Sequence, residues 1–501
     1  MVHSCKDVGI LWDLLIIGGG ATGLGSAVDA ASRGFKTLLL EQSDFAKGTS
    51  SRSTKLIHGG LRYLKQGNIS LVREALKERG LLCQNAPHLI KHLPFLIPHY
   101  HFWEIPYYRL GMKIYDLMAG KLGIEKSLGL TALEAISRIP TLEPRHLCGA
   151  TVYYDGQFDD ARLSIALAQT AASHGATLVN YMTVLSLVKM RGKIVGVIAR
   201  DEETREEVEI KAKCVINATG VFSDAIRHMD EPYAKPIMAP SQGIHLVLPR
   251  SFMPTDTAIL IPKTKDGRLI FCIPWHHQLL VGTTDTPVNK AELEPKPFES
   301  EIDFLLEHTS RYLTVKPQRK DILSIFTGLR PLVRRGGKSG AKLSRNHEIF
   351  TSASGLVTIA GGKWTTYRKM AEEVVDVAIR VGNFKKKSAC QTEHLHLHGS
   401  DAKKMDAMIE ENSQLGNLIH PKLPYKQVEV VWAVRFEMAR TLEDVLARRT
   451  RSLFLNALAS LEMAPTVVHL MAKELGKDKK WEEEQTLAYQ KIANNYLCKV
   501  G

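Results

Sequence analysis

The chain has 501 residues, 44% of them hydrophobic, and a formal net charge of +13. This length predicts two or three domains, and the composition excludes a disordered or fibrous protein. No run approaches about 18 uninterrupted apolar residues, which argues against a membrane-spanning helix. The seven cysteines are scattered and include no C-x-x-C pair, so neither a disulfide framework nor a metal site is predicted.

The positive charge favours anionic partners, either a small anionic substrate or an anionic lipid surface. Basic residues cluster at 385–387, 448–451 and 477–480. Because no RNA- or DNA-binding motif accompanies these clusters, nucleic acid is not a predicted partner.

The first element is an apolar strand, residues 14–17, that leads directly into a G-x-G-x-x-G turn. Gly18 permits the tight turn, Gly20 lets the backbone approach phosphates, and Gly23 lets the following helix lie close to the strand. The start of that helix offers free N–H groups and the positive end of the helix dipole to an anion. The pattern predicts a dinucleotide site.

The helix is expected from about Gly20 to Arg33, with Gly34 at its C-terminus, and a second buried strand covers residues 36–40. This strand ends in Glu41, which lies 18 residues beyond Gly23. An acid at this position accepts hydrogen bonds from an adenosine ribose and would repel a 2′-phosphate. Glu41 is therefore a predicted cofactor ligand.

A hydroxyl-rich loop follows over residues 43–54 and can donate hydrogen bonds to pyrophosphate oxygens. From this loop and the segment after it, the residues predicted to contact the cofactor are Thr49, Ser50, Ser53, Lys55 and Leu56. The next residues form a Gly-Gly turn that carries the polar side chains of His58, Arg62 and Tyr63.

Two later segments repeat the strand-then-glycine pattern. Residues 214–220 form a short buried strand that ends in small residues, from which Ala218 and Gly220 are predicted cofactor contacts. Residues 356–367 form another strand, followed by a glycine turn and a helix start. Its predicted contacts are Gly361, Gly362, Lys363 and Thr365. A helix N-terminus suits the end of an isoalloxazine where negative charge collects on reduction. These turns, more than 300 residues apart, predict one discontinuous FAD domain.

Taken together, these strings resemble those of the FAD-dependent glycerol-3-phosphate dehydrogenases, and the resemblance covers nearly the whole chain. The segments that carry it are residues 18–23, 53–64, 159–163, 217–220, 282–285, 328–332, 361–368 and 437–450. The most specific are K-L-I-H-G-G-L-R-Y-L at 55–64 and G-G-K-W-T-T-Y-R at 361–368. The resemblance implies oxidation of sn-glycerol 3-phosphate to dihydroxyacetone phosphate by hydride transfer to noncovalently bound FAD.

A phosphorylated triol requires a cationic pocket, and arginine pairs with phosphate in bidentate geometry. The predicted phosphate ligands are Arg62 and Arg330, and Tyr63 and His58 are further substrate-binding candidates. The resemblance places Lys363 at the flavin edge, where its charge can stabilise the reduced ring or contact substrate oxygens. Alternatively, Tyr63 only packs against its neighbours, and His58 positions the flavin.

A neutral histidine is suited to accept the alcohol proton. His245, in an alternating strand at 243–248, matches a histidine of the family near the substrate and is the preferred base or orienting group. His58 is the other candidate, and a structural role for His245 stays open. Asp285 is expected to bind a substrate hydroxyl or to orient the histidine, with an Asx turn as the alternative role.

The predicted fold class is α/β, with a two-part, Rossmann-like FAD domain of the D-amino-acid-oxidase type, an α+β substrate cap and a C-terminal helical domain. The FAD domain is assigned to residues 1–85, 150–230 and 325–385, the cap to 86–149 and 231–324, and the helical domain to 386–501. An aromatic patch at 100–108 is expected to pack in the core, cover the active site or form an interface with quinone or membrane. His394, His396 and His398 alternate as on a strand, but no acidic or cysteine cluster accompanies them, so no metal is predicted.

No EF-hand loop follows residue 450, which favours the bacterial type of the family over the animal mitochondrial form. The resemblance also implies membrane quinone as electron acceptor and peripheral attachment to an anionic membrane surface, at the cytoplasmic face of the inner membrane. A homodimer is one alternative for the assembly. The competing functions are a glycerol-3-phosphate oxidase that uses oxygen, an amine oxidase on the same fold, and a basic RNA-directed or non-catalytic flavoprotein.

Overall fold

The computed structural model describes residues 9–60, 67–262, 264, 267–335, 342–344, 346–385 and 387–499. Within these residues the chain forms two large sheets. The first has a parallel core ordered β20–β10–β1–β2–β7. These strands are β1 (Leu11–Ile17), β2 (Thr37–Leu40), β7 (Thr177–Val179), β10 (Glu207–Asn217) and β20 (Val357–Ala360). Antiparallel strands extend it, namely β8 (Met182–Met190), β9 (Lys193–Asp201) and β19 (Glu348–Thr351).

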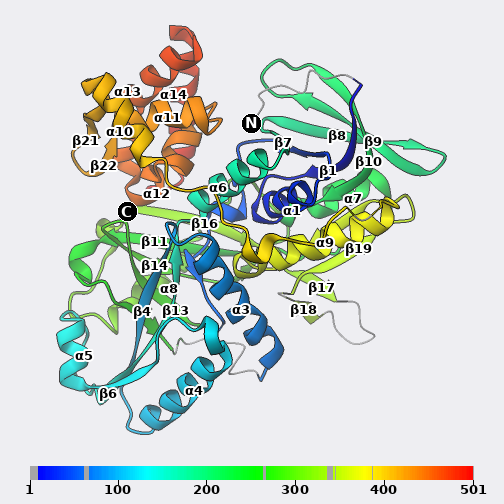
Figure 1. Cartoon of the computed structure of the whole chain (residues 1–501). Helices are drawn as coiled ribbons and strands as arrows, with labels where there is room; N and C mark the ends of the chain where they lie inside the picture. The colour runs from blue at the N-terminus through cyan, green and yellow to red at the C-terminus, as the bar shows by residue number, and fades with distance from the viewer. Residues whose placement is uncertain are drawn as a thin grey trace.

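Side chains of β1 alternate between two hydrophobic cores, as expected for a strand covered on both faces. Leu14 and Ile16 face a core shared with three helices, α1 (Ala21–Ser32), α6 (Asp160–Ser173) and α9 (Tyr367–Val381). Leu15 and Ile17 face the opposite core, which is closed by β8, β9 and α7 (Ser223–Asp230). Figure 1 shows this layered unit around β1 and α1.

The second sheet is mostly antiparallel and follows the order β15–β11–β14–β13–β12–β4–β6–β3, with β16 beside β11 and β5 beside β6. Its strands are β3 (Leu56–Ile57), β4 (Ile90–His99), β5 (Leu128–Thr131), β6 (Gly149–Phe158), β11 (Ser241–Pro249), β12 (Ala258–Ile261), β13 (Ile270–Trp275), β14 (Gln278–Gly282), β15 (Thr286–Pro287) and β16 (Ser324–Arg330). One face packs on α5 (Ala132–Arg138) and α8 (Glu299–Ser310). The other face packs on α3 (Ile69–Asn85), α4 (Glu104–Ala119) and the C-terminal region.

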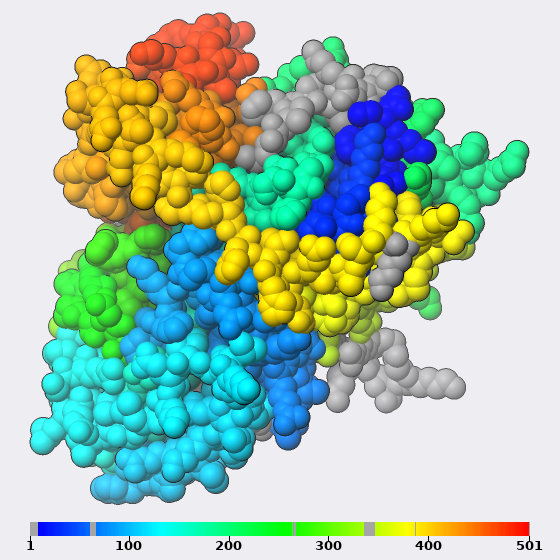
Figure 2. Space-filling model, in the orientation of Figure 1, coloured from blue at the N-terminus to red at the C-terminus, as the bar shows by residue number. Residues whose placement is uncertain are grey.

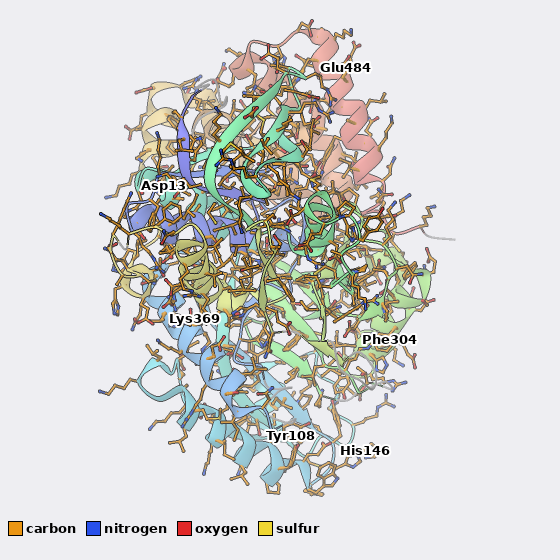
Figure 3. The ribbon with its side chains drawn as sticks, turned by 90° about the vertical axis from the view of Figure 1, so that its right-hand side faces the viewer. Asp13, Tyr108, His146, Phe304, Lys369 and Glu484 are labelled. Atoms are coloured by element: carbon orange, nitrogen blue, oxygen red, sulfur yellow. The ribbon has the colours of Figure 1, made fainter. Side chains whose placement is uncertain are left out.

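The C-terminal region is helical, as predicted, with one small hairpin. Its elements are α10 (Ala402–Glu411), β21 (Leu418–His420), β22 (Leu423–Lys426), α11 (Gln427–Phe436), α12 (Ser452–Leu455), α13 (Ala457–Leu475) and α14 (Lys479–Ala493). A short pair, β17 (Val333–Arg335) and β18 (Lys342–Ser344), lies outside the large sheets. The C-terminal helices and α4 lie at opposite ends of the molecule, which Figure 2 shows as surfaces and Figure 3 shows through Glu484 of α14 and Tyr108 of α4.

Several boundaries differ from those expected. The cap sheet includes β3, β6 and β16, all from segments that we assigned to the FAD domain, and α3 packs on the cap as well. The reason is that hydrophobic alternation identifies a strand without identifying its partner. Residues 392–394 form a 3₁₀ turn and the residues around His396 and His398 are irregular, so the strand expected there is wrong. Among the described residues, no helix has the length and hydropathy needed to cross a bilayer.

Candidate active site

Two adjoining cavities lie where the two large sheets meet. The first has a volume of about 440 Å³ and the second about 280 Å³. Residues lining both are Thr49, Pro331, Gly362, Lys363 and Trp364. A ligand in one cavity would therefore lie next to a ligand in the other.

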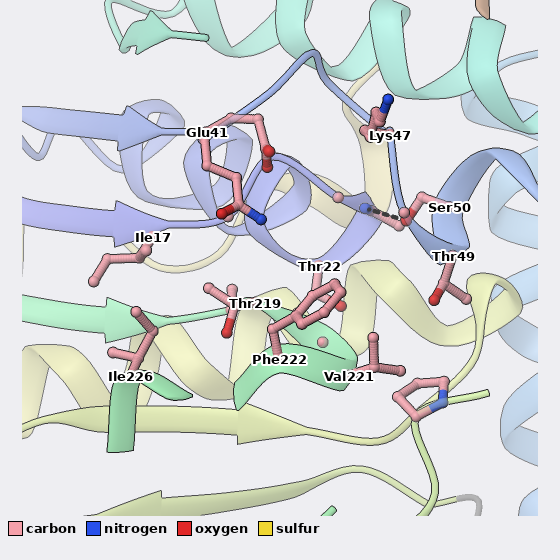
Figure 4. A pocket seen from close by; sticks show the side chains of 18 of the residues that line it. Ile17, Thr22, Glu41, Lys47, Thr49, Ser50, Thr219, Val221, Phe222 and Ile226 are labelled. Atoms are coloured by element: carbon pink, nitrogen blue, oxygen red, sulfur yellow. Dashed lines mark hydrogen bonds between the residues drawn. The ribbon is translucent and has the colours of Figure 1, made fainter. Parts of the chain in front are cut away.

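The first cavity lies at the carboxyl ends of the parallel strands and the start of α1. Its lining includes residues 17–18, 20–22, 40–42, 46–50, 182–184, 218–222 and 361–364. Figure 4 shows Glu41, Thr22 and Ser50 on one side, with Thr219, Phe222 and Ile226 facing them. This is the position at which parallel α/β sheets bind ligands.

The turn between β1 and α1 has the geometry that its glycine spacing predicts. Gly18 has a φ of +109°, and a Cβ there would lie 2.7 Å from the Ala218 carbonyl oxygen. A Cβ at Gly20 would lie 3.0 Å from Ser50 Oγ, and one at Gly23 would overlap the Gly18 carbonyl oxygen. Gly20 is the N-cap residue of α1 and has no side chain that could cap the helix. Backbone N–H groups of the first turn therefore face the cavity.

Glu41 has a buried, fixed carboxylate at the end of β2. Its Oε2 accepts a hydrogen bond from the Gly19 N–H at 2.6 Å, and its Oε1 accepts one from the Ser43 N–H at 2.9 Å. Burial raises the pKa of Glu41, and these two donors oppose the rise. The arrangement presents the acid to the cavity where a ribose diol could donate to it.

The remaining predicted cofactor contacts divide between the two cavities. Those lining the first are Thr49, Ser50, Ala218, Gly220, Gly361, Gly362 and Lys363. Ser50 Oγ accepts the Ala21 N–H at 2.9 Å, which ties the loop to the start of α1. Ser53, Leu56 and Thr365 line the second cavity instead.

Lys55 requires a correction. Its side chain lines neither cavity, and its ammonium is directed into a buried ion pair with Asp160 at 2.7 Å. Lys55 has a positive φ of +64°, and its Nζ also donates to the Ser51 carbonyl oxygen at 2.8 Å. We therefore assign its charge to Asp160 and not to the cofactor.

The first cavity fits FAD. It combines a helix N-terminus for pyrophosphate with an acid for the ribose, and it reaches the glycine turn at 361–362. Met182, Val184 and Ile226 give it an apolar wall suited to an adenine ring. A Cβ at Gly361 would lie 2.5 Å from the Asn346 carbonyl oxygen, so the backbone at this end is also closely packed.

The second cavity is lined by charged and polar side chains from distant segments. The ionisable residues on its wall are Arg52, His58, Tyr153, Asp155, His245, Arg268, Asp285, Arg330 and Lys363. Arg52 is paired with Glu294 at 2.6 Å. The cationic residues make this cavity suitable for an anionic ligand.

His245 projects from β11 into this cavity and is 3% exposed. Its Nε2 lies 2.9 Å from Thr54 Oγ1, and its ring stacks on Phe326 with centroids 4.7 Å apart. Burial, together with the charges of Lys55 and Arg330, holds the pKa of His245 well below its usual range. The imidazole is therefore neutral and can accept a proton.

Arg330, at the end of β16, organises one wall of the cavity. Its guanidinium donates to the carbonyl oxygens of Gln242 at 3.1 Å and Thr284 at 2.6 Å. It also donates to Thr283 Oγ1 at 3.2 Å and to Asp285 at 3.3 Å. Ser241 also donates to Asp285. Arg330 and Asp285 thus form one hydrogen-bonded unit on the wall.

His58 and Lys363 lie on the second cavity, while Arg62 and Tyr63 lie outside the described residues. The backbone N–H of His58 donates to Thr365 Oγ1 at 3.3 Å, which joins the K-L-I-H-G-G segment to the second glycine turn. Sequence reasoning missed Arg268 and Thr54. Thr54 is adjacent to predicted contacts, but Arg268 carries no motif. No group of three or more metal-ligating side chains occurs among the described residues.

Comparison with known proteins gives consistent matches. Residues 13–368 match the family described as FAD dependent oxidoreductase, and residues 353–484 match the C-terminal domain of alpha-glycerophosphate oxidase. A probable mitochondrial glycerol-3-phosphate dehydrogenase of Caenorhabditis elegans is 43% identical, over 97% of this chain and 73% of its own length. The mitochondrial glycerol-3-phosphate dehydrogenase of Homo sapiens is 41% identical, over 95% of this chain and 72% of its own length.

Among solved structures, the glycerol-3-phosphate dehydrogenase of Bacillus halodurans, complexed with FAD, superposes with a TM-score of 0.76. It is 30% identical, and the match covers 98% of this chain and 96% of that one. The L-alpha-glycerophosphate oxidase of Mycoplasma pneumoniae shares the fold at 18% identity, with a TM-score of 0.57 over 78% of this chain and 100% of its own.

Proposed function

The chain belongs to the family of FAD-dependent glycerol-3-phosphate dehydrogenases, and from this premise we propose that it oxidises the C2 hydroxyl of sn-glycerol 3-phosphate, forming dihydroxyacetone phosphate. The observation that carries the proposal is the junction of the two cavities at Gly362 and Lys363. There a cavity that fits FAD meets a cavity that is lined by cationic side chains and a neutral histidine.

When bound, FAD supplies the acceptor for the hydride that leaves C2. The alcohol must also lose its hydroxyl proton as the carbonyl forms. His245 is buried beside the cavity in its neutral form, and Nε2 is the nitrogen that lies 2.9 Å from a hydroxyl group. We assign the proton to this imidazole, which the Thr54 hydroxyl at Nε2 and the stacked Phe326 ring hold in place.

The phosphate group is expected to be held by cations of the second cavity. Arg330 and Lys363 line it, and Lys363 also borders the first cavity. Arg62 is proposed from the sequence as a further ligand. Asp285, fixed by Ser241 and Arg330, is positioned to accept a hydrogen bond from a substrate hydroxyl.

The test is steady-state formation of dihydroxyacetone phosphate by the purified holoenzyme with a soluble quinone analogue. We expect turnover with sn-glycerol 3-phosphate and at most about a hundredth of that kcat/KM with glycerol, since the phosphate contacts are lost. Hydrogen peroxide formation without the quinone analogue would assign oxygen as the acceptor. Turnover of glycine or sarcosine, with none of sn-glycerol 3-phosphate, would instead assign amine oxidation and contradict the proposal.

We also propose that electrons pass to membrane quinone and that the enzyme attaches peripherally to an anionic bilayer through α4. This helix buries Tyr108, Met112 and Tyr115 against the cap. Its opposite face exposes an apolar stripe at intervals of three and four residues, consisting of Trp103, Tyr107, Leu110, Ile114 and Leu117. Lys113, Lys121 and Lys126 are exposed on or close after the helix and complement anionic headgroups.

The buried face of α4 also reaches the second cavity. The Tyr115 hydroxyl donates to Asp155 at 2.8 Å and accepts the Gly59 N–H at 2.8 Å, and Asp155 lines that cavity. A bilayer on the exposed face would therefore lie near the site from which electrons leave. This connection supports a quinone in the bilayer as the acceptor.

Sedimentation with phosphatidylglycerol-containing vesicles tests the attachment. Leu110 and Leu117 are 63% and 82% exposed, and replacing both by serine removes about 2–3 kcal/mol of apolar burial. We expect vesicle binding to fall at least about tenfold. Leu487→Ser, at an exposed position on α14, is the matched control and should bind normally. Equal binding by both variants would contradict attachment through α4, and self-association lost with the serines would assign the stripe to a second copy of the chain.

The bacterial type, the location at the cytoplasmic face of the inner membrane and a homodimer stay predictions. The two mitochondrial relatives are more similar to this chain than the bacterial structure is, at 43% and 41% against 30% identity.

A further inference from the structure

Lys55 is a buried lysine for which the reaction has no direct use. Its side chain is fully buried, and Nζ donates to Asp160 Oδ2 at 2.7 Å and to the Ser51 carbonyl oxygen at 2.8 Å. Its ammonium also lies near three aromatic rings, with centroids 5.3 Å away at Trp275, 5.0 Å at Phe326 and 5.4 Å at Phe454. Burying a charge is costly even when it is paired, so such a site calls for a functional reason.

Asp160 connects this lysine to the loop beside both cavities. Oδ2 of Asp160 also accepts the Ser53 N–H at 2.9 Å and the Ser53 hydroxyl at 2.7 Å. Oδ1 accepts a hydrogen bond from Arg451 at 3.2 Å, and the same guanidinium donates to the Ser51 carbonyl oxygen at 2.8 Å. The loop is thus fixed by α6 and by the C-terminal region together.

Two of the groups that hold Lys55 also hold His245. Phe326, which stacks on the imidazole, is one of the three rings around the ammonium. Thr54, whose hydroxyl lies at Nε2 of His245, lies between Ser53 and Lys55, both of which bond Asp160. A displacement of the lysine would therefore move both supports of the imidazole.

We propose that Lys55 is a positioning residue for His245: paired with Asp160 and enclosed by aromatic rings, it fixes Thr54 and Phe326 against the imidazole and holds a positive charge next to the ring that stacks on it. The proposal rests on the proposed function, because it assigns a task to the groups behind the proposed base. It also gives the C-terminal region a part in the site, through Arg451 and Phe454.

The charges around the two groups agree with this assignment. Lys55 and Arg330 both lower the pKa of His245. Burial lowers the pKa of Lys55 to about 7, Asp160 and Asp159 oppose this, and Arg451 adds to it. Lys55 is therefore charged in the pH range in which a histidine gains its proton. The other ionisable residues on the wall of this cavity are Arg52, His58, Tyr153, Asp155, Arg268, Asp285 and Lys363.

The test compares three variants, all as holoenzymes: Lys55→Met, the double variant Lys55→Met/Asp160→Asn, which lacks both charges of the ion pair, and Lys55→Arg. The double variant removes both charges of the Lys55–Asp160 pair, leaves Arg451 paired with Asp159 at 3.6 Å, and guards against misfolding of the single variant. We expect the acid limb of the kcat/KM profile to move up by about one pH unit in both methionine variants and to return in Lys55→Arg. A merely structural lysine would lower the alkaline plateau and leave the limb in place.

A second readout does not depend on turnover. The histidine signals are titrated by NMR, and the signal of His245 is identified by its loss in His245→Asn. In both methionine variants the titration midpoint of His245 should rise by about one pH unit. The matched control is Arg33→Met/Asp29→Asn, which removes a buried ion pair on α1 with a 2.7 Å separation, distant from the second cavity. It should leave the His245 midpoint unchanged.

An unchanged His245 midpoint in folded Lys55→Met/Asp160→Asn would overturn the proposal. So would an equal shift in the Arg33→Met/Asp29→Asn control. If the wild type does not turn over sn-glycerol 3-phosphate at all, the proposed function fails, while the NMR titration still decides the role of Lys55.

Discussion

The two adjoining cavities differ in what forms their walls. The first is made largely of backbone and small residues at the ends of β1, β10 and β20, where Gly18, Gly361 and Gly362 take positive φ values. The second carries, among apolar residues, several long charged side chains and His245, drawn from segments as far apart as residues 52 and 363. The first cavity can therefore be disturbed by one added methyl group, whereas the second is disturbed by changing charge and hydrogen-bond donors.

This difference sets how each cavity should respond to substitution. Changes to the first should remove FAD from the protein. Changes to the second should leave FAD bound and alter kcat, KM or their pH dependence. Variants that mix these outcomes would show that the two cavities are not separate in function.

The largest effect is expected for Gly18→Ala. Its φ of +109° disfavours alanine, and the new methyl group would press on the Ala218 carbonyl oxygen. We expect the FAD content of the purified protein to fall at least about tenfold, measured by flavin absorbance per chain. Gly192→Ala, with a φ of +75° but no atom within 4 Å, is the matched control and should keep its FAD. Full FAD content in Gly18→Ala would contradict a backbone-defined site.

His245→Asn should lower kcat/KM by about 10²–10⁴-fold with FAD retained, because asparagine can keep a hydrogen bond to Thr54 but cannot take the proton. The measurement is steady-state turnover of sn-glycerol 3-phosphate at several pH values. His146→Asn, at an exposed position in the cap, serves as the control. Activity within threefold of wild type would remove His245 from the role of base.

Arg330→Lys should raise KM for sn-glycerol 3-phosphate by about 10–100-fold, with a smaller change in kcat. A lysine cannot reproduce the fork of donors to Gln242, Thr283, Thr284 and Asp285. FAD content should not change. A KM within threefold of wild type would place the phosphate on other cations of the cavity.

The smallest effect concerns the cap beneath α4. His99 is buried, bonds Thr151 at 2.8 Å and stacks on Tyr108, and burial lowers its pKa to about 4. Because the unfolded chain gains this proton first, stability is lost as the pH falls from about 6.5 towards 4. Against His99→Gln, we expect the wild-type Tm to drop about 2–4 °C further between pH 6.5 and 4.5. Parallel Tm curves would show that His99 gains its proton at the same pH in the folded and unfolded chain, and would contradict the lowered pKa of His99.

The sequence was informative where function depends on local backbone geometry. The G-x-G-x-x-G turn, Glu41 and the second turn at 361–362 all line the first cavity, because their spacing along one strand and helix fixes their position. The second cavity was predicted only in part. Thr54 and Arg268 reach it from the segments just before β3 and β13, and Lys55 is directed towards Asp160, in an ion pair 105 residues apart in sequence. Such contacts between distant segments leave no periodic pattern to read.

Hydride transfer from sn-glycerol 3-phosphate to the flavin is tested most directly by mixing the holoenzyme with this substrate under anaerobic conditions. The reaction is followed through the visible absorbance of oxidised flavin. We expect saturable bleaching that slows when C2 carries deuterium, with no bleaching by glycerol at the same concentration. Flavin that stays oxidised at saturating sn-glycerol 3-phosphate, or that bleaches equally fast with glycerol, would contradict this expectation.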